Sequence, residues 1–110
     1  MNDDRNPGKL CFIKVGVEQD IYIYWNTFQG QFGEHSWKAS ISFSENFSVP
    51  EKALKLLSNA LHDSTVQVVI ELDDGRRHEC VIHSIDDLAD SGLIEISSPG
   101  LGRVRLISTQ

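Results

Sequence analysis

The segment from residue 65 to residue 85 constrains the fold most, because its pattern is that of a β-hairpin. Apolar residues alternate with mainly polar ones from 66 to 72, and the alternation resumes from 77 to 85, which is the period of half-buried strands. The apolar row of the first strand consists of Val66, Val68, Ile70 and Leu72. We expect this row to face the core, beneath the apolar side of a helix.

The residues between the two strands set the register of this hairpin. A two-residue turn would place a charged residue opposite Ile70, which is a poor match for a buried face. A three-residue loop over 73–75 instead ends on Gly75, and glycine adopts the left-handed conformation at low cost. We therefore predict the register of this loop, which pairs Val66 with Ile82, Val68 with Cys80, Ile70 with His78 and Glu71 with Arg77.

The rest of the chain predicts five more strands and one helix. The strands are expected over residues 9–17, 21–25, 37–43, 93–96 and 102–108, and Gln19-Asp20 is the expected turn between the first two. Ser48 and Glu51 match a capping box, which predicts a helix that ends near His62. Its expected apolar stripe consists of Ala53, Leu54, Leu56, Leu57, Ala60 and Leu61.

These elements follow one another in the order βββαββββ and are joined by short turns. The order predicts an α+β fold in which an antiparallel sheet or partly rolled barrel of about six to seven strands packs on one helix. Residues 1–8 are polar and are expected to form a flexible N-terminal lead-in. Residues 9–110 are expected to form a single domain, a size that can bury roughly two-thirds of its unfolded surface.

The overall charge indicates which kinds of partner the chain can bind. The 110-residue chain has a formal net charge of −6 at pH 7. This balance disfavours non-specific nucleic-acid binding, which depends on clustered lysine and arginine, and it is compatible with a basic protein partner. The sequence has no apolar run of about 20 residues and no apolar signal core near Met1, so we expect no membrane contact and a cytoplasmic location. The oligomeric state stays open.

The cysteines and histidines are the candidate metal ligands. Cys11 and Cys80 lie in predicted strands, which favours buried free thiols, and a disulfide would require the two strands to be neighbours. His78 shares a strand face with Cys80, and with Cys11 and His35 the two offer ligand types that zinc accepts. Their spacing matches no metal signature. We therefore predict no metal site and no cofactor.

Sequence motifs give no catalytic residues. The chain contains no G-x-S-x-G, no Walker-type glycine loop and no H-E-x-x-H. Its aspartates lie beside serine and glycine, in loops where carboxylates are normally solvated. We therefore expect a non-catalytic protein, and keep a small enzyme as the last alternative.

An aromatic loop and acidic loops are the predicted partner-binding site. Phe28 and Phe32 interrupt an otherwise polar loop over 26–36, where exposed aromatic side chains would be typical interface anchors. The loop can equally fold back and cover the core. The acidic members of the predicted site are Asp73, Asp74, Asp86, Asp87 and Asp90. Together these residues favour a small acidic protein that binds and neutralises a basic enzyme or toxin, as a bacterial immunity protein or other inhibitor does.

Two partial resemblances favour a nucleic-acid-binding or nucleotide-binding alternative. Residues 68–76, ending in Glu-Leu-Asp-Asp-Gly-Arg, resemble the first signature segment of Sm-like RNA-binding proteins, and residues 101–104 resemble a fragment of the second. Asp87-Leu88 with Ser91-Gly92-Leu93, after Arg76-Arg77, is similar to part of the PilZ cyclic-dinucleotide domain. Each resemblance covers about a third of the chain or less. The alternative face would consist of Arg76, Arg77, Arg103 and Arg105 if the last strand pairs beside the hairpin.

Overall fold

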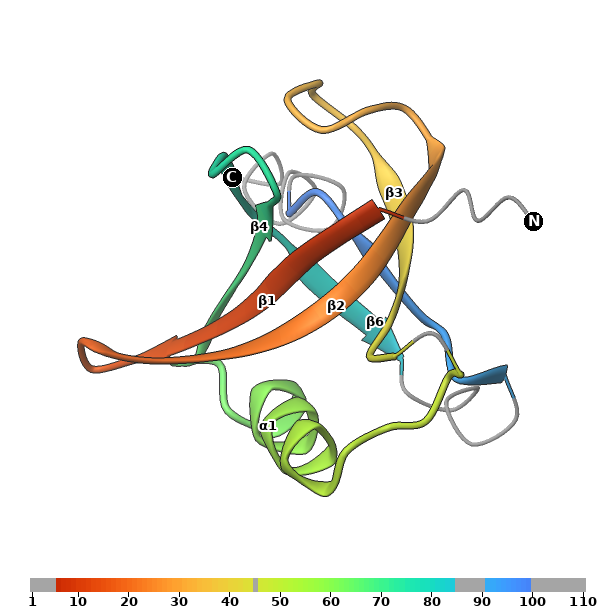
Figure 1. The fold of residues 1–110 in the computed structure, drawn as a ribbon. Coiled ribbons are helices and arrows are strands. Elements are labelled where there is room, and N and C mark those ends of the chain that lie inside the picture. The colour runs from red at the N-terminus through yellow and green to blue at the C-terminus, as the bar shows by residue number, and fades with distance from the viewer. Residues whose placement is uncertain (1–5, 45, 85–90, 100–110) are drawn as a thin grey trace.

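The computed structural model describes residues 6–44, 46–84 and 91–99. They form one helix and seven strands, shown in Figure 1: β1 (Asn6–Lys14), β2 (Val17–Gln29), β3 (Lys38–Ser42), α1 (Glu51–His62), β4 (Gln67–Leu72), β5 (Arg77–Glu79), β6 (Val81–Ser84) and β7 (Ile94–Ser97). All neighbouring strands are antiparallel and belong to one sheet, in the order β5-β4-β1-β2-β3-β7-β6. The predicted α+β class, with a sheet packed on one helix, is confirmed.

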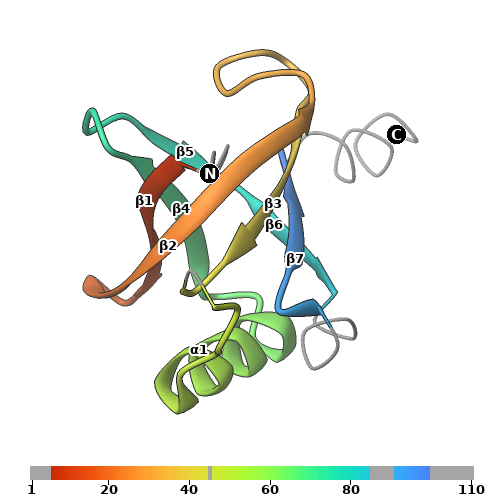
Figure 2. The same cartoon turned by 45° about the vertical axis from the view of Figure 1, so that its right-hand side comes forward.

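The sheet is rolled because its two outer strands belong to one extended stretch of chain. Only Cys80 separates β5 from β6, yet β5 pairs with β4 while β6 pairs with β7. The Cys80 N–H donates to the Val68 carbonyl at 2.9 Å, which continues the β4 pairing one residue beyond β5. The stretch therefore joins both ends of the sheet and closes it into a barrel (Figure 2).

The core fills this barrel and the space between the barrel and α1. The strand residues that are almost completely buried in it include Leu10, Ile23, Ala39, Ile41, Ile70, Ile94 and Ile96. The helix lies across one end of the barrel, as Figures 1 and 2 show, and buries Ala53, Leu56 and Leu57. The strand expected over residues 37–43 has one buried face, which consists of Trp37, Ala39, Ile41 and Phe43.

The hairpin of β4 and β5 has the predicted register. Ile70 pairs with His78 and Glu71 with Arg77, and Gly75 has a φ of 92° in the left-handed region. The Gly75 N–H donates to the Leu72 carbonyl at 2.9 Å, which closes the three-residue loop. Two expectations fail. Ile82 pairs with Ile96 because β6 turns to β7, and Val69, expected on the polar face, is buried because β1 places Cys11 directly beside it.

The first hairpin differs from the prediction. Its turn lies at Val15-Gly16, where both residues have positive φ (52° and 78°), and not at Gln19-Asp20. Two left-handed residues form the tight turn that suits the twist of a two-stranded hairpin. As a result β2 is 13 residues long and includes the expected turn and the start of the expected aromatic loop. β1 begins at Asn6, so the last residues of the expected lead-in are part of a strand.

The helix begins and packs differently from the prediction. Pro50 is the N-cap residue and no side chain caps the helix, so Ser48 does not form a capping box. The side that meets the barrel is narrow: it contains Ala53, Leu56 and Leu57, with Ala60 partly buried. Leu54 and Leu61 are exposed because they lie outside this narrow side.

Some predicted features lie outside the described residues. These are the strand over 102–108, most of the lead-in, and the site residues Asp86, Asp87, Asp90, Arg103 and Arg105. Within the described ranges, no helix has the length and apolar character needed to cross a bilayer.

Candidate protein-binding surface

The aromatic loop covers the end of the barrel opposite α1, so only one of its two predicted anchors is exposed. Phe32 meets the rings of Trp25 and Trp37 edge-on, at centroid distances of 4.9 and 4.5 Å, and stacks on His78 at 5.4 Å. The expectation that Phe32 is an exposed anchor is therefore wrong, because the loop folds back onto the core. Phe28 lies at a bulge of β2 and is 57% exposed.

The acidic turn of the second hairpin is partly neutralised within the chain. Asp73 and Asp74 are both exposed. The Asp74 carboxylate accepts hydrogen bonds from the Arg76 backbone N–H at 3.0 Å and from the Arg76 Nε at 2.7 Å. These bonds, the backbone one above all, lower the pKa of Asp74. Arg76 is correspondingly ion-paired.

Arg77 connects the two hairpins. Its Nε donates to Glu71 Oε1 at 2.8 Å and its NH2 group donates to Glu18 Oε2 at 2.8 Å. Hydrogen bonds from Arg77 lower the pKa of both carboxyl groups, and the two carboxylates raise the pKa of Arg77. Both arginines of the predicted basic face that the structure describes are therefore engaged with carboxylates, which leaves them less free to bind phosphate.

The two cysteines lie on opposite sides of the barrel wall. Cys80 belongs to the core, whereas Cys11 lies on the outer face between β2 and β4, and both thiols are free and buried. Burial raises the pKa of Cys11 to about 12 and also raises that of Cys80. The Cys11 sulfur lies within 4.8 Å of carboxylate oxygens of Glu18 and Asp20. Because Glu18 binds Arg77 through both oxygens, this group is explained by the ion pair alone.

One serine–histidine contact in the described part of the chain resembles a nucleophile–base pair. The Ser97 Oγ donates to the Ser98 carbonyl at 3.2 Å and lies 2.7 Å from His83 Nε2. The hydroxyl has a single proton, and in the arrangement that uses it on the Ser98 carbonyl the His83 imidazole donates to Ser97. Ser97 is also only 1% exposed, so we assign it a structural role between β6 and β7.

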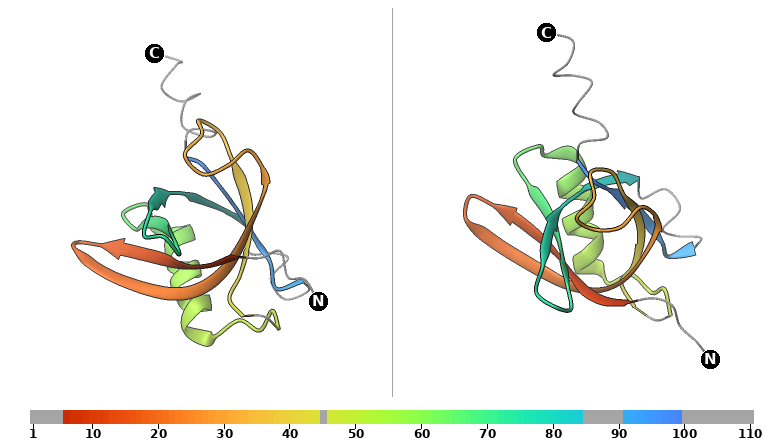
Figure 3. Two further views of the ribbon diagram at one scale, coloured as in Figure 1. Left: turned by 45° about the horizontal axis from the view of Figure 1, so that its top comes forward. Right: turned by 90° about the horizontal axis from the view of Figure 1, so that it is seen from above.

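The first hairpin has an open strand edge. β1 pairs with β2 along residues 17–25, whereas β3 pairs with β2 only from Tyr24 to Gln29. Among the described residues, the stretch 17–23 therefore has no strand on its second side. Figures 1 and 3 show the β1–β2 hairpin projecting from the barrel. Its exposed apolar side chains are Val15 (89%), Val17 (63%) and Tyr22 (78%).

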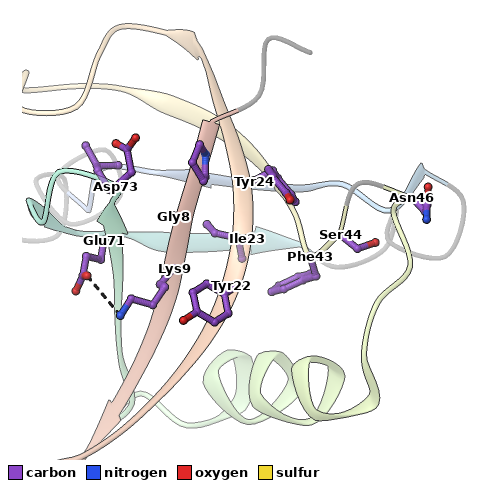
Figure 4. Close-up of a pocket in the computed structure, with 12 residues that line it drawn as sticks. Gly8, Lys9, Tyr22, Ile23, Tyr24, Phe43, Ser44, Asn46, Glu71 and Asp73 are labelled. Carbon is purple, nitrogen blue, oxygen red and sulfur yellow. Dashed lines mark ion pairs between the residues drawn. The ribbon is translucent and has the colours of Figure 1, made fainter. Parts of the chain in front are cut away.

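A hollow lies at each end of this open edge. Tyr22 and Ile23 line the first, of about 620 Å³, together with Phe43, Ser44 and Asn46 from the chain that follows β3 (Figure 4). The same hollow is bounded on its other side by the ion pair of Lys9 and Glu71, whose charged atoms are 3.5 Å apart. Val17 and Gln19 line the second hollow, of about 480 Å³, which separates the hairpin from Leu56 and Asn59 of α1.

The charge on the open edge is acidic. Residues 17–23 include Glu18 and Asp20 and contain no lysine or arginine. At the tip of the hairpin, Lys14 forms an ion pair of 2.6 Å with Asp63, which ties the tip to the end of α1. Asp20 is therefore the exposed carboxylate of this edge that Arg77 does not bind.

Sequence reasoning missed this surface because it placed the hairpin turn four residues too late. Gln19 and Asp20 are common turn residues, whereas Val15 rarely has positive φ. Gly16 was the available signal, since an isolated glycine inside a strand pattern often marks an irregularity.

Comparisons with protein-family models, curated proteins and solved structures found no match to this chain.

Proposed function

We propose that this chain is a non-catalytic, acidic protein-binding domain that binds a basic partner protein, as an inhibitor or immunity protein does. The observation that supports this function best is the β1–β2 hairpin, which leaves a strand edge unpaired by the described residues and exposes Val15, Val17 and Tyr22 along its length. Exposed apolar side chains on a projecting element are typical of protein-binding surfaces, and tyrosine is enriched among the residues that contribute most to binding.

The charge of the chain supports the choice of partner. A net charge of −6 attracts a basic protein during encounter, while the apolar side chains of the hairpin supply the contacts that hold the complex. In this scheme Asp73 and Asp74, in the turn between β4 and β5, act mainly through the electrostatic field, and Phe28, near the end of β2 away from the hairpin tip, is a second exposed apolar contact.

The test uses a photo-crosslinking residue at position 17, with one at Lys52 on the exposed side of α1 as the matched control. We expect position 17 to capture a basic protein that position 52 does not. The captured protein, once purified, should bind with an on-rate that falls as salt rises, and Tyr22→Ala should weaken the complex while Leu54→Ala, another exposed apolar residue, should not. Equal affinity of Tyr22→Ala and wild type would refute the site, and tight binding of a short RNA or cyclic dinucleotide instead would refute the function.

A further inference from the structure

We infer that the partner supplies an extended segment of alternating apolar and basic residues, which pairs with residues 17–23 of β2 as an added strand. This inference rests on the proposed function and specifies how the same surface binds. A strand that has a neighbour on one side directs about half of its backbone N–H and C=O groups to the other side. For residues 17–23 the groups on β1's side are used, and no described strand uses the rest.

The hollow beside α1 fits the alternation of an added strand. Successive side chains of β2 point to opposite faces, so Val17 and Gln19 face the hollow beside α1, while Glu18, Asp20 and Tyr22 face outward. A strand lying beside this edge would alternate in the same way. Its inward side chains would enter the hollow near Leu56, and its outward side chains would lie beside the acidic residues.

The charges on the edge favour a foreign segment over a second copy of this chain as the added strand. If the edge of a second copy paired antiparallel around Gln19, Glu18 would face Asp20. If it paired around Asp20, the two Asp20 carboxylates would face each other. Like charges directly opposite one another destabilise a strand pair, so full antiparallel overlap of two copies of residues 17–23, which is centred on Asp20, is disfavoured. Outward lysine or arginine on a foreign strand would instead lie beside Asp20 as an opposite charge, since Glu18 is already bound by Arg77.

The experiment uses the whole chain and a fluorescent peptide, Lys-Val-Lys-Ile-Lys-Val-Lys, with two N-methylated versions that each block alternate backbone N–H groups. Strand addition predicts that one methylated version loses at least about tenfold in affinity, equivalent to about 1.4 kcal/mol, while the other binds as the parent does. In NMR hydrogen exchange, alternate amides of residues 17–23 should become protected. Asp20→Lys should weaken binding, and Glu51→Lys on α1 should serve as the matched control.

The outcomes separate this inference from the proposed function. Equal effects of the two methylated peptides, or no new protection in residues 17–23, would overturn strand addition. The function would survive that result if Tyr22→Ala still weakened the crosslinked partner's complex. A dimer in sedimentation that the peptide dissociates would identify a second copy as the occupant and would also overturn the inference. If crosslinking and Tyr22→Ala gave no effect, the proposed function itself would fail.

Discussion

The two hairpins of this protein are built from similar strands but have different neighbours in the sheet. The β4–β5 hairpin has β1 on one side, and on its other side β5 is the last strand of the sheet, whose chain continues directly into β6 and so closes the barrel. The β1–β2 hairpin has β4 on one side, and on its other side β3 leaves before the tip. The β4–β5 hairpin is therefore part of the barrel wall, whereas the β1–β2 hairpin extends beyond it.

We therefore expect the β4–β5 hairpin to contribute mainly to the stability of the fold and the β1–β2 hairpin mainly to contacts with a partner. The closed hairpin places Val68, Ile70 and Leu72 in the core, where each apolar side chain contributes to folding. The projecting hairpin exposes Val15, Val17 and Tyr22, which contribute little to the core and stay available for contacts with another molecule. The predictions below test whether this division holds.

The largest expected effect compares Ile70→Ala with Val17→Ala. Ile70 is completely buried, so its truncation should lower the free energy of unfolding by about 2–5 kcal/mol. Val17 is mostly exposed, so the same kind of truncation should change that free energy by no more than about 0.5 kcal/mol. Urea unfolding of the two variants measures both values. A loss at Val17 as large as that at Ile70 would mean that the projecting hairpin belongs to the stabilising core.

The second prediction compares the turns of the two hairpins through Gly75→Ala and Gly16→Ala. Both glycines have positive φ, and both would place a new Cβ in open space, so only backbone strain distinguishes the variants from wild type. Each should lose about 1–2 kcal/mol of unfolding free energy. Gly75→Asn and Gly16→Asn should lose less, because asparagine tolerates the left-handed region. If alanine had no effect at either position, the turn conformation described for that hairpin would be wrong.

The third prediction concerns His78, whose buried Nε2 has no hydrogen-bond partner among the described residues and whose ring stacks on Phe32. His78→Phe keeps the stack and removes the unpaired atom, so it should raise the free energy of unfolding by about 1 kcal/mol. Burial, and secondarily Arg76, lower the pKa of His78 below its ordinary value of 6.5. The unfolded chain therefore binds the proton more readily, and wild-type stability should fall as pH drops below 6.5.

Thermal unfolding between pH 7.5 and 5 checks the sign of this effect. The melting temperature of His78→Phe should fall less over this range than the melting temperature of wild type. His35→Phe, which removes an exposed histidine near His78, is the matched control. A steeper slope in His78→Phe than in wild type would contradict the prediction.

The smallest expected effect is at the ion pair that ties the projecting hairpin to α1. Hydrogen bonds from Lys14, and secondarily from Thr65, lower the pKa of Asp63 below its ordinary value of 3.8. The stabilisation is present above the unfolded pKa and is lost as pH falls through the folded one. Asp63→Asn should therefore lower the melting temperature slightly at pH 5 and converge with wild type at strongly acid pH. Asp73→Asn is the control. If the difference in melting temperature between Asp63→Asn and wild type stayed constant with pH, the ion pair would have no part in the loss.

Local signals in the sequence were sufficient for the closed hairpin. Gly75 and the alternation on both sides of it predicted the register that pairs Ile70 with His78, because a slip of one residue would expose the apolar row. The same reasoning failed at Val15-Gly16, since a valine with positive φ is rare and only pairing of β1 with two strands enforces it. Phe32 was also ambiguous, because its partner His78 is distant in the chain.

The amino-acid sequence by itself determined the class of fold, the existence of the helix, the buried faces of β3 and β4, and the acidic character of the chain. These properties depend on residues close together in the chain or on composition alone. Only the tertiary structure decided that the stretch from Arg77 to Ser84 divides between β4 and β7, that Val69 is buried, and that no strand of the described ranges pairs with the outer side of residues 17–23. The physical reason is that an edge is defined by the strands that are absent beside it, and strand neighbours are chosen by contacts between distant residues.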